Sequence, residues 1–276
     1  MLTDYHVHLR PDDVDATPAE RYLTAANAER YREAAEERGI EELGVAEHVY
    51  RFTEALEVWQ HDLWRHCARD DLDAYCDFVR EETDLKLGIE ADFVPGREDR
   101  IANLLEQRDW DFVVGSVHFL RDSSLDTEDY SIWGTGESAD RIWRRYFETI
   151  AESALSGLYD VIGHPDLVKV WGAKAPRPDK DPRYFYEPAV EAFAEAGVAV
   201  EVSTAGLRKP VGEIYPARPF LEMIVEAGCP IALSSDAHLP EQLGFRYEEA
   251  LEVLAECGVT ELAVFERRQR RMEPIG

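Results

Sequence analysis

The sequence predicts an α/β protein in which seven parallel strands close into a distorted, TIM-like (β/α)7 barrel. Seven short apolar runs alternate with helical patterns along its 276 residues, which is typical of parallel strands joined by helices. Residues able to bind metal follow six of these runs, whereas an open sheet gathers its ligands at a single point. Because a closed barrel brings all strand ends to one mouth, we expect one domain over residues 1–276, with its metal site at the C-terminal mouth.

The predicted strands are seven apolar runs. They cover residues 1–8, 40–46, 85–91, 111–117, 159–163, 198–202 and 230–233. Helical spacing of apolar residues predicts the helices between them. These helices cover residues 18–38, 53–83, 97–107, 139–156, 188–196, 219–227 and 247–256. The first helix is expected to begin with Thr17 as its N-cap and Pro18 in its first turn.

Three segments do not fit this alternation. Residues 119–136 form a long irregular insertion, which is either a lid or binding loop or a packed surface excursion. Residues 169–182 contain three prolines and are expected to be extended rather than helical. After a last apolar run at 261–265, the basic residues 267–271 are expected to form a solvated tail.

The composition restricts the classes of function. Acidic residues outnumber basic ones by 57 to 30, which gives a net charge of -27. A surface of this charge repels polyanions, so we expect a small-molecule ligand and no nucleic acid. With no run of 18 apolar residues and no secretory leader, we expect a cytoplasmic protein without a membrane partner. The four cysteines form no C-x-x-C pair and are expected to be reduced thiols, and the oligomeric state is left open.

Two histidines in the first strand begin the predicted site. Side chains of a strand alternate between its faces, so His6 and His8 should point one way while Tyr5 and Val7 point the other. Two imidazoles on one face can chelate a metal ion. A His-x-His pair also occurs by chance on exposed strands, so the prediction depends on the ligands that follow later strands.

Further histidines and carboxylates at strand ends complete a candidate metal site. Its members are His6, His8, Glu47 or His48, Glu90, His118, His164, Asp236 and His238. Imidazole and carboxylate ligands suit zinc, manganese or iron, and a carboxylate among histidines can bridge two ions. Because one ion cannot use eight ligands, we expect two or three divalent ions about 3.5–4 Å apart, a cluster suited to displacement at phosphorus. His61 and His66, in the segment 53–83, are interpreted as surface or supporting residues.

These motifs resemble the polymerase and histidinol phosphatase (PHP) superfamily. The resemblance combines the His-x-His pair, a Glu-His pair, an isolated glutamate, two strand-end histidines and a late Asp-x-His. The segments EHVYRF, GIEADFVPG, GSVHF, GHPDLV and STAGLRKPVGEIYP are similar to the histidinol-phosphatase branch of that superfamily. The resemblance covers the chain from Tyr5 to His238 and implies a distorted (β/α)7 barrel with a trinuclear metal site.

The resemblance also implies which residues hold each ion. The first ion would be held by His6, His8, Glu90 and Asp236, the second by Glu90, His118 and His164, and the third by His48 and His238. The family often adds a histidine to the third ion from the loop after strand one. Here that loop offers Asp12, Asp13 and Asp15 instead.

The function that the resemblance implies is hydrolysis of L-histidinol phosphate, a phosphomonoester, in histidine biosynthesis. Glu90, Asp236 and His238 would be the catalytic residues. Arg208 would bind the substrate phosphate, since a guanidinium can donate two parallel hydrogen bonds to its oxygens, and Lys169 would assist. Either cation could instead form a surface salt bridge. Two alternatives stay open, namely the same chemistry on another phosphate ester, nucleotide or phosphodiester, and a non-catalytic domain.

Overall fold

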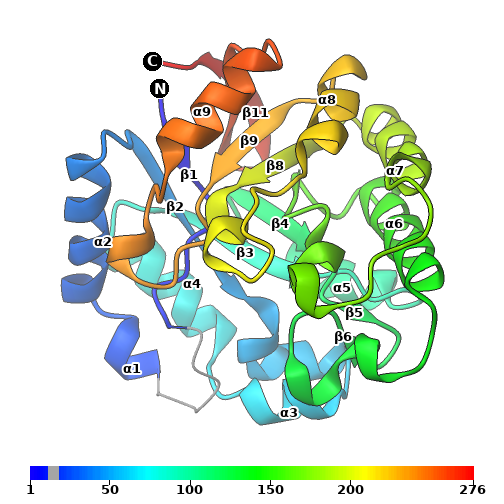
Figure 1. The fold of residues 1–276 in the computed structure, drawn as a ribbon. Coiled ribbons are helices and arrows are strands. Elements are labelled where there is room, and N and C mark those ends of the chain that lie inside the picture. Colours follow the sequence, from blue (N-terminus) through cyan, green and yellow to red (C-terminus); the bar gives the residue numbers. More distant parts are fainter. Residues whose placement is uncertain (12–18) are drawn as a thin grey trace.

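The computed structural model, which describes residues 1–11 and 19–276, contains the predicted barrel (Figure 1). Seven parallel strands form one sheet in the order β1-β2-β3-β4-β7-β8-β9. These strands are β1 Thr3–Asp4, β2 Glu42–His48, β3 Lys86–Asp92, β4 Phe112–Ser116, β7 Val161–Ile162, β8 Ala199–Ser203 and β9 Ile231–Ser234. The predicted fold class is therefore confirmed. The expected helix start at Thr17 and Pro18, and the loop aspartates Asp12, Asp13 and Asp15, lie outside the described residues.

The barrel closes between its first and last strands through a short contact. Val7 forms an isolated parallel bridge with Ala237, and the His8 N–H donates to the Ala237 carbonyl at 2.8 Å. Asp4 adds a second connection, because its Oδ1 accepts from the Ser235 N–H at 3.0 Å. The strand that carries the His-x-His pair is therefore fixed against the segment that follows β9.

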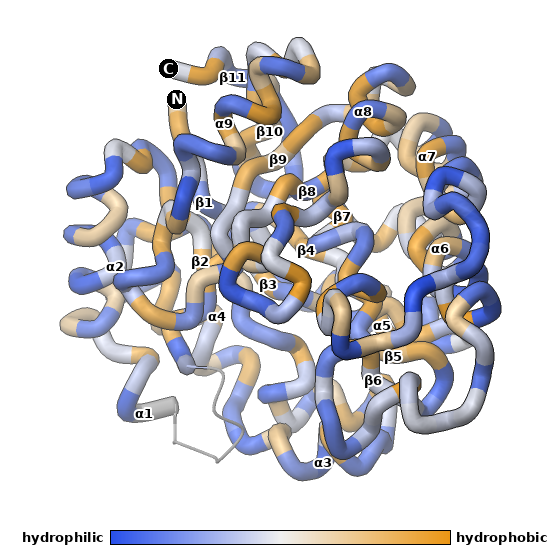
Figure 2. Tube along the Cα trace, viewed as in Figure 1, coloured by the Kyte–Doolittle hydropathy of each residue, from blue (hydrophilic) through white to orange (hydrophobic). Residues whose placement is uncertain are grey.

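Helices surround the barrel, as Figure 1 shows. They are α1 Ala19–Tyr22, α2 Ala25–Glu37, α3 Asp62–Cys67, α4 Leu72–Glu82, α5 Glu98–Glu106, α6 Ala139–Leu155, α7 Arg183–Ala196, α8 Arg218–Glu226 and α9 Tyr247–Glu256. Hydrophilic residues gather on their outer faces and on the loops (Figure 2). Among the residues described, no helix is both long and apolar enough to span a bilayer.

Two predicted helices are interrupted in the structure. The first breaks before Thr24, whose hydroxyl caps α2. The helix predicted over 53–83 is divided into a 3-10 turn (η2, Thr53–Glu57), α3 and α4, and the side chains of His61 and Asp71 cap the two helices. Both predictions were too long because apolar spacing persists across such breaks, so the capping residues and not the periodicity mark the helix starts.

The chain from 167 to 196 is more helical than predicted. Two 3-10 turns, η5 (Leu167–Lys169) and η6 (Gly172–Lys174), occupy the start of the segment that was expected to be extended. Helix α7 begins at Arg183 rather than at Pro188, and the proline lies inside it. A proline within a helix removes one backbone hydrogen bond, which the packing of α7 against α6 offsets.

The C-terminal residues are mostly exposed, as predicted for 267–271, but they form a hairpin and not an irregular tail. Strand β10 (Glu261–Glu266) pairs antiparallel with β11 (Gln269–Pro274), and this brings the C-terminus beside the N-terminus (Figure 1). The turn is anchored at the starts of β4 and β7, because Arg268 donates through its N–H to the Asp111 carbonyl at 2.8 Å and through Nε to Asp160 at 2.9 Å. A basic tail gives no local sign of such distant acceptors.

Aromatic rings fill the barrel below its mouth. Tyr5, Phe112 and Phe265 pack together there, and the ring centres of Tyr5 and Phe112 are 5.0 Å apart. Gly88 makes room for them, because a Cβ at this position would lie 2.2 Å from the Phe112 ring. Val7 packs in the larger, separate core cluster. Tyr5 and Val7 therefore pack in different clusters, and regular pairing of β1 ends before them, at residue 4.

Candidate metal centre

All eight predicted metal ligands lie together at the C-terminal ends of the barrel strands. They are His6 and His8 after β1, His48 at the end of β2, Glu90 in β3, His118 after β4, His164 after β7, and Asp236 and His238 after β9. Each of them is at most 9% exposed. The barrel thus collects on one buried surface residues that are more than 200 positions apart in the sequence.

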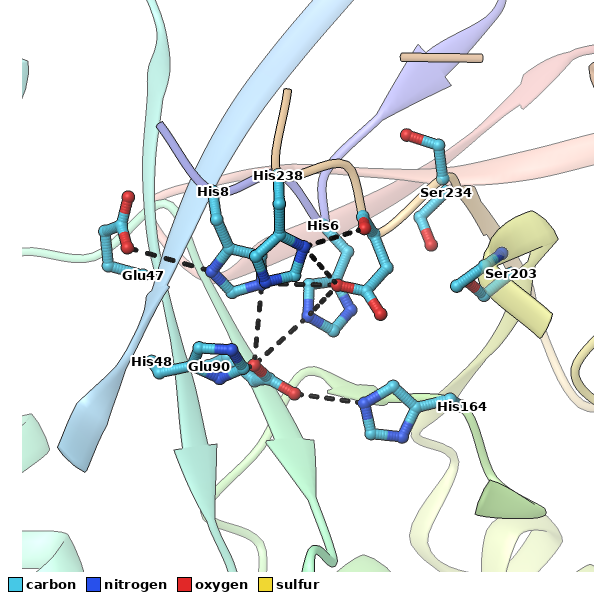
Figure 3. Close-up of polar contacts among 12 residues, drawn as sticks. His6, His8, Glu47, His48, Glu90, His164, Ser203, Ser234 and His238 are labelled. Carbon is cyan, nitrogen blue, oxygen red and sulfur yellow. Dashed lines mark hydrogen bonds and ion pairs between the residues drawn. The ribbon is translucent and has the colours of Figure 1, made fainter. Parts of the chain in front are cut away.

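Glu90 is at the centre of this group (Figure 3). The ladder between β2 and β3 pairs it with His48. Five histidine nitrogens surround its carboxylate: His164 Nε2 at 3.1 Å, His6 Nε2 at 3.3 Å, His118 Nε2 at 3.4 Å, His8 Nε2 at 3.6 Å and His48 Nδ1 in direct contact. The Ser116 hydroxyl also donates to Glu90 Oε1 at 2.7 Å. A carboxylate in this position can contact more than one ion.

Asp236 faces the same histidines through its Oδ1, which lies 3.3 Å from His8 Nε2 and 3.7 Å from His6 Nε2. The backbone φ angles of Asp236 and His164 are 49° and 23°, values that are uncommon outside glycine. Such strain persists only where the surrounding structure imposes it, and it concentrates at functional sites. Both strained residues are candidate ligands.

The facing atoms fit divalent metal ions. Among the described residues, four overlapping groups of buried ligand atoms lie within 4.8 Å of one another. The groups are His8–His48–His238, His6–His8–Glu90, His6–His164–Asp236 and His48–Glu90–His118. Within them His6 Nε2, His8 Nε2 and Glu90 Oε2 are buried atoms with no hydrogen-bond partner. An unpaired buried polar atom is costly, and a metal ion at these positions would satisfy it.

The structure distinguishes the two alternatives at the end of β2. His48 Nδ1 contacts Glu90, whereas Glu47 contacts Arg51 and accepts from the Leu9 N–H at 2.8 Å. Glu47 Oε2 also lies 3.8 Å from Nδ1 of His8, on the far side of that ring from the centre (Figure 3). His48 is therefore the ligand candidate, and Glu47 supports a neighbouring ligand.

Two further carboxylates behind the ligands escape the sequence analysis. Glu201 Oε1 lies 2.8 Å from His6 Nδ1, and Asp92 Oδ1 lies 2.8 Å from His118 Nδ1. Each contacts the ring nitrogen opposite the one that faces the centre. A carboxylate in this place fixes the orientation and tautomer of the ring and raises its basicity as a ligand.

Glu201 is the most connected of these supporting carboxylates. It also accepts from the His164 N–H at 2.5 Å and from the Ser234 hydroxyl at 2.6 Å. A glutamate inside the apolar run 198–202 is the signal that could have identified it, because a buried carboxylate requires partners. For Asp92 the signal is its position two residues after Glu90 in the same strand, which places both on one face.

Burial and neighbouring charges act in opposite directions on the pKa values of the ligands. Burial would lower the pKa of His6 and His118, but nearby carboxylates outweigh it, so the pKa of His6 is raised and that of His118 is raised to about 10. At His48 burial dominates and the pKa is well below its ordinary value. Burial would raise the pKa of Glu90, yet the surrounding histidines hold it well below its usual range.

A cavity of about 430 Å³ opens onto the metal centre. Five candidate ligands line it, namely His48, His118, His164, Asp236 and His238. The insertion 119–136 supplies part of its wall through Phe119 and residues 126–128, while Leu125 and Ile132 of the same insertion are buried in the core. The insertion is therefore packed and lines the cavity at the same time.

The two predicted phosphate-binding cations lie in different surroundings. Arg208 ends the 3-10 turn after β8 (η7, Thr204–Arg208), and its Nη2 donates to the carbonyls of Ser235 and Asp236, both at 2.8 Å. Its Nη1 is buried and has no hydrogen-bond partner. The ammonium of Lys169 instead contacts Asp166 at 2.9 Å and donates to the Ile214 carbonyl at 2.8 Å. Neither cation is among the residues that line the cavity, but Arg208 contacts the main chain of Asp236, which does line it.

The two remaining histidines of interest stay outside the metal centre. His61 is buried and packs against Trp59, Phe119 and Tyr130, with ring centres 4.5 to 5.0 Å away. His66 lies exposed on α3. The interpretation of His66 as a surface residue is confirmed, and His61 supports the wall of the cavity through its contact with Phe119.

Known proteins share this sequence and this fold. The family model of the PHP domain matches residues 22–205. A protein of Deinococcus radiodurans named "Probable histidinol-phosphatase" is 33% identical over 280 residues, covering 99% of both chains. The histidinol-phosphatase of Bacillus subtilis is 27% identical and covers 81% of this chain and 91% of its own.

A solved structure supports the fold. The histidinol phosphate phosphatase HisK of Lactococcus lactis, crystallised with zinc, L-histidinol and phosphate, superposes with a TM-score of 0.71 at 18% identity. The match covers 98% of each chain. The HisK protein of Listeria monocytogenes gives the same TM-score at 20% identity, covering 90% of this chain and 99% of its own.

Proposed function

Because this chain belongs to the PHP domain family, we propose that it is a histidinol-phosphatase, a metal-dependent hydrolase that converts L-histidinol phosphate to L-histidinol and phosphate in histidine biosynthesis. One observation carries the proposal. Glu90 lies among five buried histidines, and three of these, His48, His118 and His164, line a cavity large enough for a small phosphate ester. This donor set suits metal-assisted hydrolysis.

We further propose that the centre holds two or three ions of zinc, manganese or iron, with Glu90 shared between two of them. His6, His8 and Asp236 would complete the first set of ligands, and His118 and His164 the second. His48 and His238 would hold the third ion, and the group they form with His8 supports this assignment. When bound, the ions would supply Lewis-acid stabilisation of the phosphate oxygens and lower the pKa of the attacking water.

The chain's own part in the reaction is to hold and orient the reactants. Glu90 places fixed negative charge among the histidines, and Asp236 and His238 lie beside each other at the cavity wall, which is why these three are proposed as catalytic. Arg208 has one free donor, Nη1, beside the Asp236 loop, and we propose that this donor binds a phosphate oxygen. Lys169 would act from outside the cavity. Its ammonium donates to the Ile214 carbonyl, and this contact would support the segment between Arg208 and Pro216.

The function is tested with a panel of substrates. Purified protein loaded with zinc or manganese should release phosphate from L-histidinol phosphate with a higher kcat/KM than from nucleotides, sugar phosphates or bis(p-nitrophenyl) phosphate. Removal of metal by a chelator should abolish the activity, and metal should restore it. A higher kcat/KM on a phosphodiester or nucleotide would contradict the proposed substrate, and metal-loaded protein without any phosphatase activity would favour a non-catalytic domain.

Arg208 provides a separate test of the phosphate contact. Arg208→Ala should lower kcat/KM on L-histidinol phosphate by about 10²-fold, the usual cost of losing one preorganised charge-stabilising donor, with the metal content unchanged. Arg208→Lys should recover only part of the loss, because lysine keeps the charge without the planar fork. If the alanine variant loses metal in proportion to activity, then Arg208 positions the Asp236 loop and does not bind phosphate.

We also infer that residues 1–276 act as one cytoplasmic domain on a small molecule. The C-terminal hairpin places Phe265 inside the barrel, so the last elements belong to the same core as the first. Fractionation of the native cells tests the location.

A further inference from the structure

The cavity wall contains acidic side chains that are not among the candidate metal ligands. Besides Asp236, two acidic residues line it, Asp126 and Glu128, and both come from the insertion. Glu128 is exposed, whereas Asp126 is partly buried. A partly buried carboxylate is screened less by water and salt, so Asp126 exerts the stronger field inside the cavity.

The structure fixes Asp126 beside the metal ligand His118. The Leu125 N–H donates to the His118 carbonyl at 2.9 Å, and the Trp171 indole N–H donates to the Leu125 carbonyl at 2.7 Å. The Ser124 hydroxyl donates to Asp126 Oδ1 at 2.8 Å. These contacts hold the carboxylate in place, and no ion pair with a basic residue neutralises it in the described part of the chain.

The charge of Asp126 also acts on Tyr215, another residue of the cavity wall. Tyr215, which lines the cavity from the segment after β8, has a raised pKa, mainly because it is buried and then because of the charges of Asp166, Asp236 and Asp126, in that order. The Tyr215 hydroxyl is buried without a hydrogen-bond partner. The cavity wall therefore has negatively charged side chains on the insertion and the neutral hydroxyl of Tyr215 on the side of β8.

The proposed substrate carries two charges of opposite sign close together. In L-histidinol phosphate the ammonium group and the phosphoester oxygen are on adjacent carbon atoms. Once the phosphate is at the metal ions, the ammonium must stay within the same cavity, where the ions and Lys209 repel it. The carboxylate of Asp126, which is held beside His118, offsets that repulsion.

We propose that Asp126 binds the ammonium group of the substrate and that this contact gives the enzyme its preference for amino-alcohol phosphates. The inference rests on the proposed function, because it assumes a phosphate ester with a neighbouring amine. It assigns the contact to Asp126 rather than to Glu128, whose exposed side chain can move away from the cavity.

The test combines one variant with two substrates. Wild-type enzyme and Asp126→Asn are compared on L-histidinol phosphate and on 3-(imidazol-4-yl)propyl phosphate, which lacks only the amine. The variant keeps an oxygen for the Ser124 hydroxyl but loses the charge. Its kcat/KM should fall about 10- to 100-fold on the amine substrate, the usual effect of losing one charged hydrogen bond, and change less than about twofold on the other.

Glu128→Gln is the matched control, because it removes a charge from the same insertion and the same cavity wall. It should lower kcat/KM on the amine substrate less than about threefold, as expected for an exposed group. Metal content is measured for every protein. An equal loss on both substrates in Asp126→Asn would assign Asp126 a structural role in holding the loop and overturn the proposal.

The remaining outcomes separate this inference from the proposed function. If wild-type enzyme hydrolyses both phosphates equally well, the enzyme does not discriminate between substrates with and without the amine. The inference then fails, and the phosphatase function stands. If Glu128→Gln shows the larger loss on the amine substrate, the contact belongs to Glu128 and the inference is wrong. If neither phosphate is hydrolysed by metal-loaded wild-type enzyme, the proposed function fails and the inference fails with it.

Discussion

The metal centre has an inner and an outer part that are built differently. The inner histidines, His6, His8 and His118, each have a carboxylate near the ring nitrogen that does not face Glu90. The outer histidine His48 instead stacks on the ring of His8, with ring centres 4.2 Å apart. His238 also stacks on His8, at 4.3 Å, and its Nδ1 lies 3.7 Å from Asp236 Oδ1. His238 Nδ1 lies 3.2 Å from a main-chain carbonyl, that of Asp236.

This difference has a consequence for metal affinity. A carboxylate behind a histidine holds the ring in one orientation and strengthens it as a ligand, whereas a stacked ring gains little of either. The inner part should therefore retain its ions under conditions that remove an ion from the outer part. The comparison can be tested by changing a residue in each part and counting the ions that remain.

The largest effect is expected from Glu90→Gln, because this residue faces both parts of the centre. The change removes the negative charge that five histidines share, so at least two ions should be lost. Activity should fall by more than about 10²-fold. Elemental analysis and steady-state kinetics measure the two effects. If the loss is smaller than that of His48→Ala, then Glu90 is not shared between ions.

Glu201→Gln tests the support of the inner part. It keeps the shape of the side chain but weakens its contacts with His6 Nδ1 and the His164 N–H. Metal affinity should fall by about 10- to 100-fold, as is usual for a supporting residue behind a ligand. Competition with a fluorescent chelator measures the affinity directly. Unchanged affinity, in a variant that folds normally, would show that the inner histidines do not depend on their carboxylates.

His48→Ala tests the outer part. Because His48 lies at the cavity wall and its support is a stacked ring, the variant should lose one ion and keep the others. The matched change in the inner part is His118→Ala, which should lower the total by more. Ion counts after dialysis against a weak chelator compare the two variants. Equal losses would remove the distinction between the inner and outer parts.

The smallest effect concerns pH. Burial lowers and nearby carboxylates raise the pKa of His118, to about 10 against 6.5 in an unfolded chain. In metal-free protein this stabilisation is complete below pH 6.5 and is lost as the pH rises toward 10. Tm of the metal-free protein should therefore fall over that interval, while metal binding, which requires neutral histidines, becomes stronger. A Tm that rises with pH in the presence of chelator would contradict the assignment.

The sequence identifies the ligand residues where the signs of them are local. The His-x-His pair and the histidines that end apolar runs could be identified because strand alternation and strand ends are local properties, and all of these residues meet in the structure. The apolar run around Glu201 indicates a buried carboxylate, but its partners, His6 and Ser234, could not be named because they are distant in the sequence. The same reason explains the hairpin at 261–274, whose anchors are Asp111 and Asp160.

Helix boundaries were less predictable than strand ends. The segment 53–83 has apolar residues at helical spacing throughout, yet His61 and Asp71 cap new helices within it. Lys169 illustrates a different limit. The resemblance predicts that it assists in binding phosphate, but its ammonium contacts Asp166 and the Ile214 carbonyl, which the local sequence does not reveal.

The short contact that closes the barrel has a consequence for the synthesis of the protein. His8 is held by the carbonyl of Ala237, so ligands from the first and last strands reach their places only after residue 238 has left the ribosome. A chain that ends before residue 236 lacks Asp236 and His238, so it presents an incomplete set of candidate ligands. Binding of the proposed ions is therefore expected only after the two ends of the chain have met.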